Sequence, residues 1–370
     1  MNLDRTIPLL SLVVLLLFAM IATNPVLFTS DMEPELSDDE RIYTTMSSSE
    51  PDLTSAIPEF SLDEVTANLA SMGPINSIVI HQNGEQVVER YFNGMNSSRT
   101  HNIKSASKSI LSLLVGIAID KGYLEGVDQE IGEFFPEYFS QNPDPGKESI
   151  TVGDLLTMRS GLQSTSGGNY GRWVLSRNWV HYALDRPLVG EPGVDRIYST
   201  GTTHLLGVIL SKASGMSLRN FANRYLFQPM GVRLGGWDLD PSGYYLGGNN
   251  MALRPADMVK VGQLMLNVGS WNGEQLVSKE WVIRSVIPVT GRTREINYGY
   301  LWFRRMSDGY HEIYAWGNGS QFIKIIPELE AVIVATTRSQ SGATRGYRNR
   351  LISAIDSDII PHLEQRAQFN

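Results

Sequence analysis

The residues best suited to chemistry are a serine and a lysine three positions apart, in the run Ser105-Ala-Ser-Lys108. An i, i+3 spacing places both side chains on one face of a helix. A lysine whose pKa is lowered by burial can act as the base that turns a serine hydroxyl into a nucleophile. Because the first N–H groups of a helix lack partners within it, the N–H of Ser105 could donate to an oxyanion. Taken alone, the same two residues also fit a helix N-cap and a lysine that snorkels from a helix end.

The segment that carries this pair is apolar over most of its circumference. Apolar side chains occur at positions 106, 110, 111, 113–115 and 117–119. A helix that is apolar nearly all round is buried inside a large domain. The pattern therefore predicts a buried helix over 105–124, with the reactive pair at its start.

The elements around this helix predict an α+β fold. Two β-branched runs within 75–92 flank Asn83-Gly84, the favoured pair for a type I′ hairpin turn. Strand-like runs follow near the other end of the chain, at 298–303, 312–316, 321–326 and 331–337. Between them lie helical pieces over 125–250. One of these is a short helix that begins at a capping box from Thr151 to Asp154 and that Gly161 could end. Further helices are predicted at 255–267, 274–286 and 346–363. The order predicts one antiparallel sheet built from both chain ends and flanked by helices, with a helical subdomain inserted.

The composition excludes several classes of protein. The chain has 370 residues, a net charge of −8 and no cysteine. A nucleic-acid binder would show a basic surface, and cysteine chemistry is ruled out. The six histidines never approach HxH or HExxH spacing, and no phosphate-binding or dinucleotide-binding glycine motif is present. We therefore expect no metal, no cofactor and no nucleic-acid partner.

The N-terminal part of the chain differs from the rest. Residues 7–22 form an apolar run preceded by Arg5, which predicts a signal peptide or membrane anchor over 1–28. Residues 31–64 hold eleven acids against Arg41 alone, which indicates an acidic flexible linker over 29–62. The body, 63–370, is nearly neutral. These features predict an exported protein, periplasmic or membrane-anchored, with the body outside the cytoplasm; cleavage of the leader is left open.

Five motifs in order carry a resemblance to a known group of proteins. They are His101–Lys108, Asp154–Leu162, Pro192-Gly193 leading into Tyr198-Ser-Thr200, Asn297–Trp302 and Trp316–Phe322. Over roughly 65–365 the chain resembles the serine β-lactamase and penicillin-recognition superfamily. It is most similar to the class C β-lactamase-related group, which includes carboxylesterases and 6-aminohexanoate-dimer hydrolases. The resemblance implies a β-lactamase/transpeptidase-like fold and a serine hydrolase in the body.

The resemblance also implies roles for three side chains. Ser105 matches the nucleophile of the family and Lys108 its lysine partner. Tyr198 matches the tyrosine that shuttles a proton to the leaving group, which a phenol beside an ammonium can do.

The third motif of the family, a Lys-Thr-Gly or His-x-Gly on an inner strand, is altered to Trp316-Gly317-Asn318. The resemblance implies that a backbone N–H of this strand, that of Asn318 or alternatively that of Gly319, completes the oxyanion hole with that of Ser105. Gly317 and Gly319 let the backbone approach a substrate closely.

Two departures from the family bear on the substrate. Thr200 stands where the family has an asparagine that binds an acyl amide, and Trp316 replaces a cation that binds a carboxylate. Both changes favour esters or non-peptide amides over β-lactams. The loops 163–175, with Tyr170 and Trp173, and 233–250 could line the cleft and contact the substrate.

The leading hypothesis is an exported serine hydrolase that cleaves a small-molecule ester or amide through an acyl-enzyme. One alternative is a catalytically weak or idle penicillin-recognition-like protein that binds peptidoglycan or a protein partner. Another is a membrane-tethered structural protein without a site. The sequence leaves the natural substrate and the oligomeric state open.

Overall fold

The computed structural model describes residues 61–289, 297–338 and 345–369. The predicted leader over 1–28 lies outside these residues, as does the linker over 29–62 except for its last two positions. Within the described ranges, no helix is both long and apolar enough to cross a membrane.

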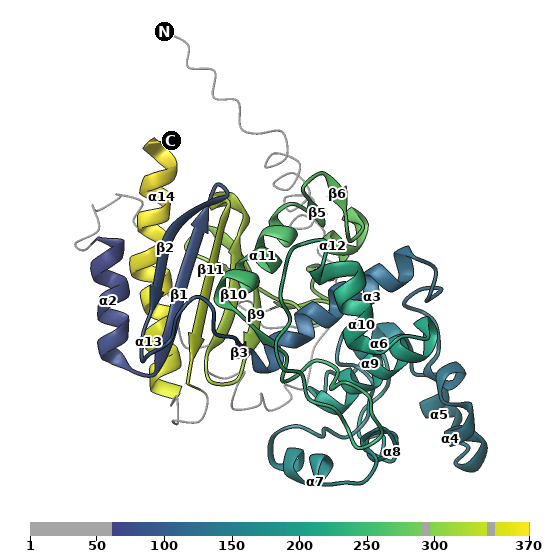
Figure 1. Cartoon of the computed structure of the whole chain (residues 1–370). Coiled ribbons are helices and arrows are strands. Elements are labelled where there is room, and N and C mark those ends of the chain that lie inside the picture. Colours follow the sequence, from purple (N-terminus) through teal and green to yellow (C-terminus); the bar gives the residue numbers. More distant parts are fainter. Residues whose placement is uncertain (1–60, 290–296, 339–344, 370) are drawn as a thin grey trace, which may run out of the picture.

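One antiparallel sheet of seven strands forms the centre of the molecule (Figure 1). Its order is β2-β1-β11-β10-β9-β8-β7, so strands from both ends of the chain lie side by side, as predicted. The strands are β1 (Ile75–Gln82), β2 (Glu85–Tyr91), β7 (Asn297–Tyr298), β8 (Phe303–Ser307), β9 (Tyr310–Gly317), β10 (Gln321–Ile326) and β11 (Ala331–Thr337).

Tight turns set the hairpins at both ends of the chain. Asn83 and Gly84 have φ values of 53° and 76°, the left-handed pair that a type I′ turn requires. The prediction of a single strand over 298–303 is wrong. That segment turns back between β7 and β8, with Leu301 at a φ of 60°. The turn is seated tightly, because a Cβ on Gly299 would lie 2.2 Å from the Ser285 carbonyl oxygen.

Helices cover both faces of the sheet (Figure 1). One face packs against α2 (Leu62–Met72), α13 (Arg345–Ala354) and α14 (Ile360–Phe369), the last two joined by a π-helical turn over Ile355–Ile359. The other face packs against α3 (Ser107–Asp120) and α11 (Pro255–Leu266). The helix predicted over 346–363 is interrupted by this π-helical turn, and it extends further than predicted, to Phe369.

The region between β2 and β7 is mostly helical, and its elements follow in chain order. They are β3 (His101–Asn102), η1 (Lys104–Ala106), α3, η2 (Ile131–Phe134), α4 (Pro136–Gln141), α5 (Pro145–Glu148), α6 (Val152–Leu156), η3 (Gly167–Asn169), α7 (Tyr170–Val174), α8 (Trp179–Leu184), α9 (Thr200–Ser214), α10 (Leu218–Ala222), η4 (Asn223–Phe227), β4 (Ala252–Leu253), α11, β5 (Ser270–Trp271), β6 (Glu274–Gln275) and α12 (Lys279–Ser285). A last turn, η5 (Pro327–Leu329), joins β10 to β11.

Local capping explains where several of these helices begin and end. The predicted box is present, because the Thr151 side chain accepts from the Asp154 N–H and Asp154 accepts from the Thr151 N–H. The helix ends at Leu156, before Gly161, and Met158 adopts the left-handed φ of 60°. The helix predicted over 274–286 is shortened to α12, because β5 and β6 form a hairpin and Ser278 caps the helix.

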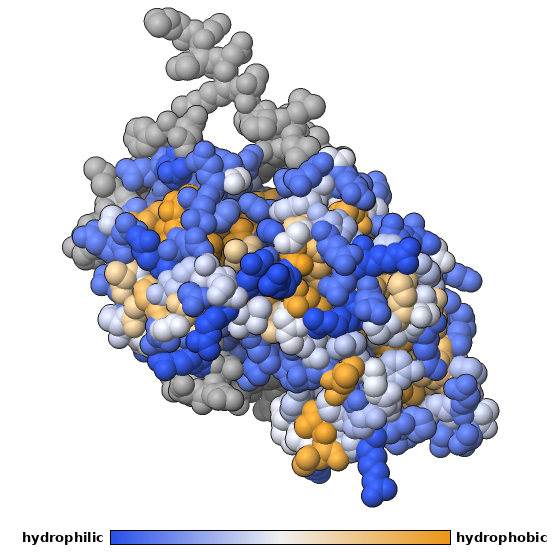
Figure 2. Space-filling view, in the orientation of Figure 1, coloured by the Kyte–Doolittle hydropathy of each residue, from blue (hydrophilic) through white to orange (hydrophobic). Residues whose placement is uncertain are grey.

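Surface side chains show few large apolar areas. The face drawn in Figure 2 is mostly hydrophilic, with scattered hydrophobic patches. Single exposed apolar residues such as Leu175 are usual on folded proteins and require no partner.

A buried ionic cluster joins the sheet to the C-terminal helices. Lys324 of β10 lies 2.8 Å from Glu312 of β9 and 3.0 Å from Asp356, which belongs to the turn between α13 and α14. Arg305 of β8 bonds to both carboxylates. Burial alone would raise the pKa of Glu312, but Lys324 and Arg305 outweigh it and lower that pKa to about 2. Glu312 is therefore charged at neutral pH and depends on both cations.

We predict that Lys324→Met lowers the free energy of unfolding by about 3 to 5 kcal/mol, because two buried carboxylates lose a partner. The matched control is Arg366→Met, which removes a pair with Glu85 whose side chains are 40% and 74% exposed. That change should cost at most about 1 kcal/mol. Urea unfolding followed by circular dichroism measures both. Equal losses in the two variants would contradict the structural role of the cluster.

Candidate active site

Ser105 lies in a single 3-10 turn, η1, immediately before the long buried helix α3. The helix begins at Ser107, not at 105 as predicted, and ends at Asp120, before Gly122 turns left-handed with a φ of 72°. Side chains brace the turn, because Asn102 accepts from the Lys104 N–H at 2.9 Å and Ser107 donates to the Lys104 carbonyl at 2.6 Å. Ser105 itself is half-buried, which leaves part of its surface open to solvent.

Lys108 is only 2% exposed, and it is held by three groups from separate segments. Its Nζ lies 3.1 Å from Ser105 Oγ, 2.9 Å from the Gly248 carbonyl oxygen and 3.3 Å from Thr200 Oγ1. Burial lowers the pKa of Lys108 to about 7. A sizeable fraction of this lysine is therefore a neutral amine at neutral pH.

The partners of the neutral amine decide where its lone pair points. A neutral amine has two N–H donors and one lone pair. The Gly248 carbonyl can only accept, and the Thr200 hydroxyl can accept as well. With the two N–H groups directed to these oxygens, the lone pair faces Ser105 Oγ. The geometry thus suits transfer of the Ser105 proton to Lys108.

Tyr198 and Thr200 lie where the chain enters α9. Tyr198 is half-buried, and the Lys108 Nζ lies 5.1 Å from the centre of its ring. Thr200 is the first residue of α9; its Oγ1 lies 3.0 Å from Ser166 Oγ, which also accepts from the Thr200 N–H. The structure therefore brings Tyr198, Thr200 and Lys108 together.

The altered third motif lies at the end of β9, directly against the turn that holds Ser105. A Cβ on Gly317 would lie 2.2 Å from the Ile103 carbonyl oxygen, so no larger residue fits there without moving the strand. Asn318 follows the strand and is exposed, and Gly319 adopts a φ of 80° in the turn to β10. This close approach brings Asn318 to the same end of the sheet as Ser105.

Trp316 points to the sheet face that carries the C-terminal helices. It is half-buried and packs against the second core cluster. The guanidinium of Arg348, on α13, lies 5.1 Å from the centre of its ring. A cation, Arg348, therefore lies against Trp316, the residue that replaces the cation of the family motif.

The two loop aromatics differ in their surroundings. Tyr170 is half-buried, and its hydroxyl accepts from Asn249 at 3.1 Å. Trp173 is fully buried against Trp179 and Leu246, and its indole N–H donates to the Trp179 carbonyl. The prediction that Trp173 contacts the substrate is therefore corrected: its ring has no surface left to present.

Two groups of the site had no signal in the sequence analysis. Gly248 supplies an acceptor for Lys108 from 140 residues away, and Ser166 holds Thr200 from 34 residues away. Neither belongs to a recognisable motif. Consecutive glycines at 247 and 248 are the one feature that marks a close backbone approach.

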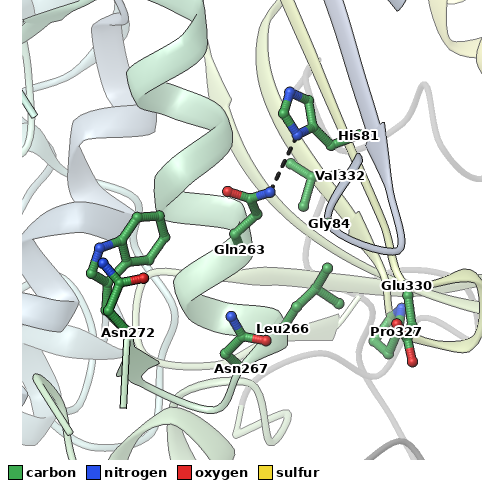
Figure 3. A pocket seen from close by; sticks show the side chains of 10 residues that line it. His81, Gly84, Gln263, Leu266, Asn267, Asn272, Pro327, Glu330 and Val332 are labelled. Carbon is green, nitrogen blue, oxygen red and sulfur yellow. Dashed lines mark hydrogen bonds between the residues drawn. The ribbon is translucent and has the colours of Figure 1, made fainter. Parts of the chain in front are cut away.

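A separate pocket of about 270 Å³ lies away from these residues (Figure 3). His81, Gln263, Asn267 and Glu330 are among the side chains around it, and His81 Nδ1 lies 3.2 Å from Gln263 Nε2. Strand register places it at the Ala331 end of β11, whereas the Ser105 turn meets the sheet at the opposite, Gly317 end of β9. This pocket is therefore not the candidate active site.

The described residues hold no group of three or more histidines or acids that could bind a metal. The groups around Ser105 are side-chain hydroxyls, an amine, a phenol and backbone amides. What this arrangement can do chemically is acid–base-assisted nucleophilic attack.

Comparison with known proteins gives one family and several relatives. The family described as Beta-lactamase matches residues 74–357. The 6-aminohexanoate-dimer hydrolase of Paenarthrobacter ureafaciens is 22% identical over 287 residues, which cover 72% of each chain. The penicillin-binding protein 4* of Bacillus subtilis (strain 168) is 28% identical over 137 residues, 35% of this chain, and the match spans only 29% of that protein's length.

Solved structures show the same fold. The structure titled EstCE1, a hydrolase with promiscuous acyltransferase activity, superposes with a TM-score of 0.66 and 16% identity. The match covers 80% of this chain and 98% of that one. The predicted α+β, β-lactamase/transpeptidase-like fold is confirmed.

Proposed function

The chain belongs to the beta-lactamase family, and from this premise we propose that it is a serine hydrolase that cleaves an ester or amide bond through an acyl-enzyme on Ser105. The observation that carries the proposal is the 3.1 Å distance between Lys108 Nζ and Ser105 Oγ, in a buried setting that lowers the pKa of the amine to about 7. A base of this kind next to a half-buried hydroxyl is what nucleophilic catalysis by serine requires.

In the first step, Ser105 Oγ attacks the carbonyl carbon of the substrate while its proton passes to the Lys108 amine. The carbonyl oxygen becomes an oxyanion, which accepts from the N–H groups of Ser105 and Asn318. Preorganised donors of this kind supply a large part of the rate enhancement in acyl transfer. The contact of Gly317 with the Ile103 carbonyl supports this pairing, because it fixes β9 against the Ser105 turn.

The tetrahedral intermediate then expels the leaving group, which needs a proton. In the proposed mechanism Tyr198 supplies it and regains one from the Lys108 ammonium, which lies 5.1 Å from the centre of its ring. The products of this half-reaction are the ester of Ser105 and the released alcohol or amine. Water then attacks the acyl-enzyme, gives up a proton through the same groups, and releases the acid.

The polar groups near Ser105 favour uncharged esters and linear amides. Thr200 is committed to Lys108 and Ser166, so it offers little to an acylamide. Trp316 takes the motif position where a carboxylate would need a cation, and its indole packs on the face of the C-terminal helices, with the Arg348 guanidinium 5.1 Å from the ring centre. We propose a small-molecule substrate without a carboxylate at this position.

We predict that Ser105→Ala abolishes turnover of p-nitrophenyl butyrate and the mass increase on the Ser105 peptide, because the nucleophile is gone. The control is Ser112→Ala on the same helix, whose buried hydroxyl has no hydrogen-bond partner among the described residues. That variant should keep full activity. Intact mass spectrometry after rapid quenching measures the adduct. No adduct and no turnover in the unsubstituted protein would favour the idle binding protein, and full activity of Ser105→Ala would overturn the assignment of Ser105 as the nucleophile.

We predict that kcat/KM is at least about 10-fold higher for p-nitrophenyl butyrate than for nitrocefin, a cephalosporin. A carboxylate left poorly paired in a partly desolvated cleft loses on the order of 1 to 3 kcal/mol. Both substrates are measured on one preparation. Thr200→Asn serves as a probe, since an amide restores partners for the acylamide and should narrow the gap. Faster turnover of nitrocefin by the unsubstituted protein would contradict this assignment.

We also propose that residues 1–28 export the protein, as the apolar run after Arg5 predicts. A fusion of residues 1–60 to alkaline phosphatase, which is active only after export, should be active. Replacing two leucines of the run with arginines should abolish that activity without changing expression. An inactive, cytoplasmic fusion of the original segment would contradict the proposal.

A further inference from the structure

A buried histidine–carboxylate pair lies one helical turn beyond the site residues on α9. His204 follows Thr200 by four residues, and its Nε2 lies 3.1 Å from Asp240 Oδ2. Neither side chain has any exposed surface. The reaction steps above use neither residue, and a buried pair of this kind needs a reason, because burying a carboxylate is costly unless it is well bonded.

The hydrogen bonds of His204 define its protonation pattern. The Gly247 N–H lies 3.3 Å from Nδ1, so Nδ1 accepts and carries no proton. Nε2 therefore carries the proton and donates to Asp240. Asp240 is fixed in turn by the backbone N–H groups of Ser242 and Tyr244, both at 2.8 Å. Burial would raise the pKa of Asp240, but the bonds from His204 and Tyr244 outweigh it and hold that pKa below its usual range.

His204 and Lys108 contact the same short segment, at consecutive residues. Gly247, which donates to the imidazole, precedes Gly248, whose carbonyl accepts from Lys108 at 2.9 Å. The fit is tight on both residues. A Cβ on Gly247 would lie 2.3 Å from the Thr203 carbonyl oxygen, and one on Gly248 would lie 2.7 Å from Lys108 Cγ. A small displacement of the backbone at Gly247 would move the Gly248 carbonyl away from the amine.

We propose that His204 and Asp240 are positioning residues for Lys108: they hold the backbone at Gly247 so that the carbonyl of the next residue, Gly248, takes one N–H of the amine and leaves the lone pair facing Ser105. The inference rests on the proposed role of Lys108 as the base. Neither residue touches the substrate. Asp240 fixes the tautomer of His204, this tautomer leaves Nδ1 as an acceptor, and the acceptor fixes the Gly247 N–H, one residue before the carbonyl that Lys108 contacts.

Packing alone does not account for the pair. The imidazole packs against both Trp173 and Trp179, with ring centres 5.8 and 5.7 Å away in T-shaped geometry. An apolar ring would fill that space without the cost of a buried carboxylate. Asp240 is the charged group that faces His204, and the Tyr198 ring, at 5.1 Å, is the titratable group beside Lys108. The buried Trp173, predicted to contact the substrate, packs instead against His204.

Two substitutions at one position separate the two bonds of the imidazole. In His204→Gln, the amide nitrogen reaches the place of Nε2 and can still donate to Asp240, but the acceptor for Gly247 is lost. In His204→Asn, the amide oxygen reaches the place of Nδ1 and can still accept from Gly247, but the donor to Asp240 is lost. The readout is the pH profile of kcat/KM for p-nitrophenyl butyrate, with urea unfolding measured in parallel.

The unsubstituted protein should gain activity as the pH rises through about 7, because the base must be neutral. A carbonyl that accepts from Lys108 favours its charged form, so losing that contact lowers the pKa further. His204→Gln should therefore shift the acid limb to lower pH by about half a unit to one unit and lower the plateau about 10- to 100-fold. His204→Asn should keep the acid limb in place and lose stability instead.

The outcomes distinguish this inference from the function on which it rests. If the unsubstituted protein forms no adduct at Ser105, the proposed function fails. If it forms the adduct and the acid limb of His204→Gln coincides with its own, only the positioning role fails. Should His204→Gln not fold, Asp240→Asn decides, because an amide can donate to the ring and permits the other tautomer. That variant should shift the acid limb in the same direction, and an unchanged limb would overturn the inference.

Discussion

The burial of one lysine is the constraint on which this structure depends. Lys108 is 2% exposed and belongs to α3, a helix that is buried over almost its whole length. An amine in such a place must find every partner within the protein. It finds them in the turn before its own helix, at the start of α9 and in the segment before β4. Three separate stretches of chain must therefore meet at one nitrogen, and the short elements of the helical region are arranged so that they do.

The central sheet carries a second polar system on its other face. Along β10, Ile323 and Ile325 pack with the cluster that contains α3, whereas Lys324 between them joins the ionic cluster under the C-terminal helices. Alternation along one strand thus separates Lys324, which is paired with two carboxylates, from the other side of the sheet, where Lys108 is buried and its pKa is lowered. The first gains two carboxylates and supports the fold. The second gains only neutral oxygens, and its lowered pKa suits chemistry.

Local signals explain what could be predicted from the sequence. The strands at 321–326 and 331–337 and the turn at Asn83-Gly84 follow from alternation and turn residues within a few positions. The pairing of Ser105 with Lys108 follows from a spacing of three. The turn at 299–302 could not be predicted, because it depends on a contact between Gly299 and the carbonyl of Ser285. Gly248 and Ser166 lie in loops whose position is set by tertiary packing, which no periodicity in the sequence reports.

The hydroxyl that replaces an amide next to Lys108 limits what the site can recognise. A threonine hydroxyl has one donor and two acceptor positions. In this structure one acceptor position meets the Lys108 amine, and a second position is taken by the Ser166 hydroxyl, whichever of the two oxygens donates. At most one position of Thr200 remains for a ligand, whereas a carboxamide in the same place would bring two donors and an acceptor. In the proposed mechanism, the hydrogen bonds that hold Lys108 therefore occupy the positions of Thr200 that an acylamide would need, whereas a plain ester, which needs only an oxyanion hole, does not depend on them.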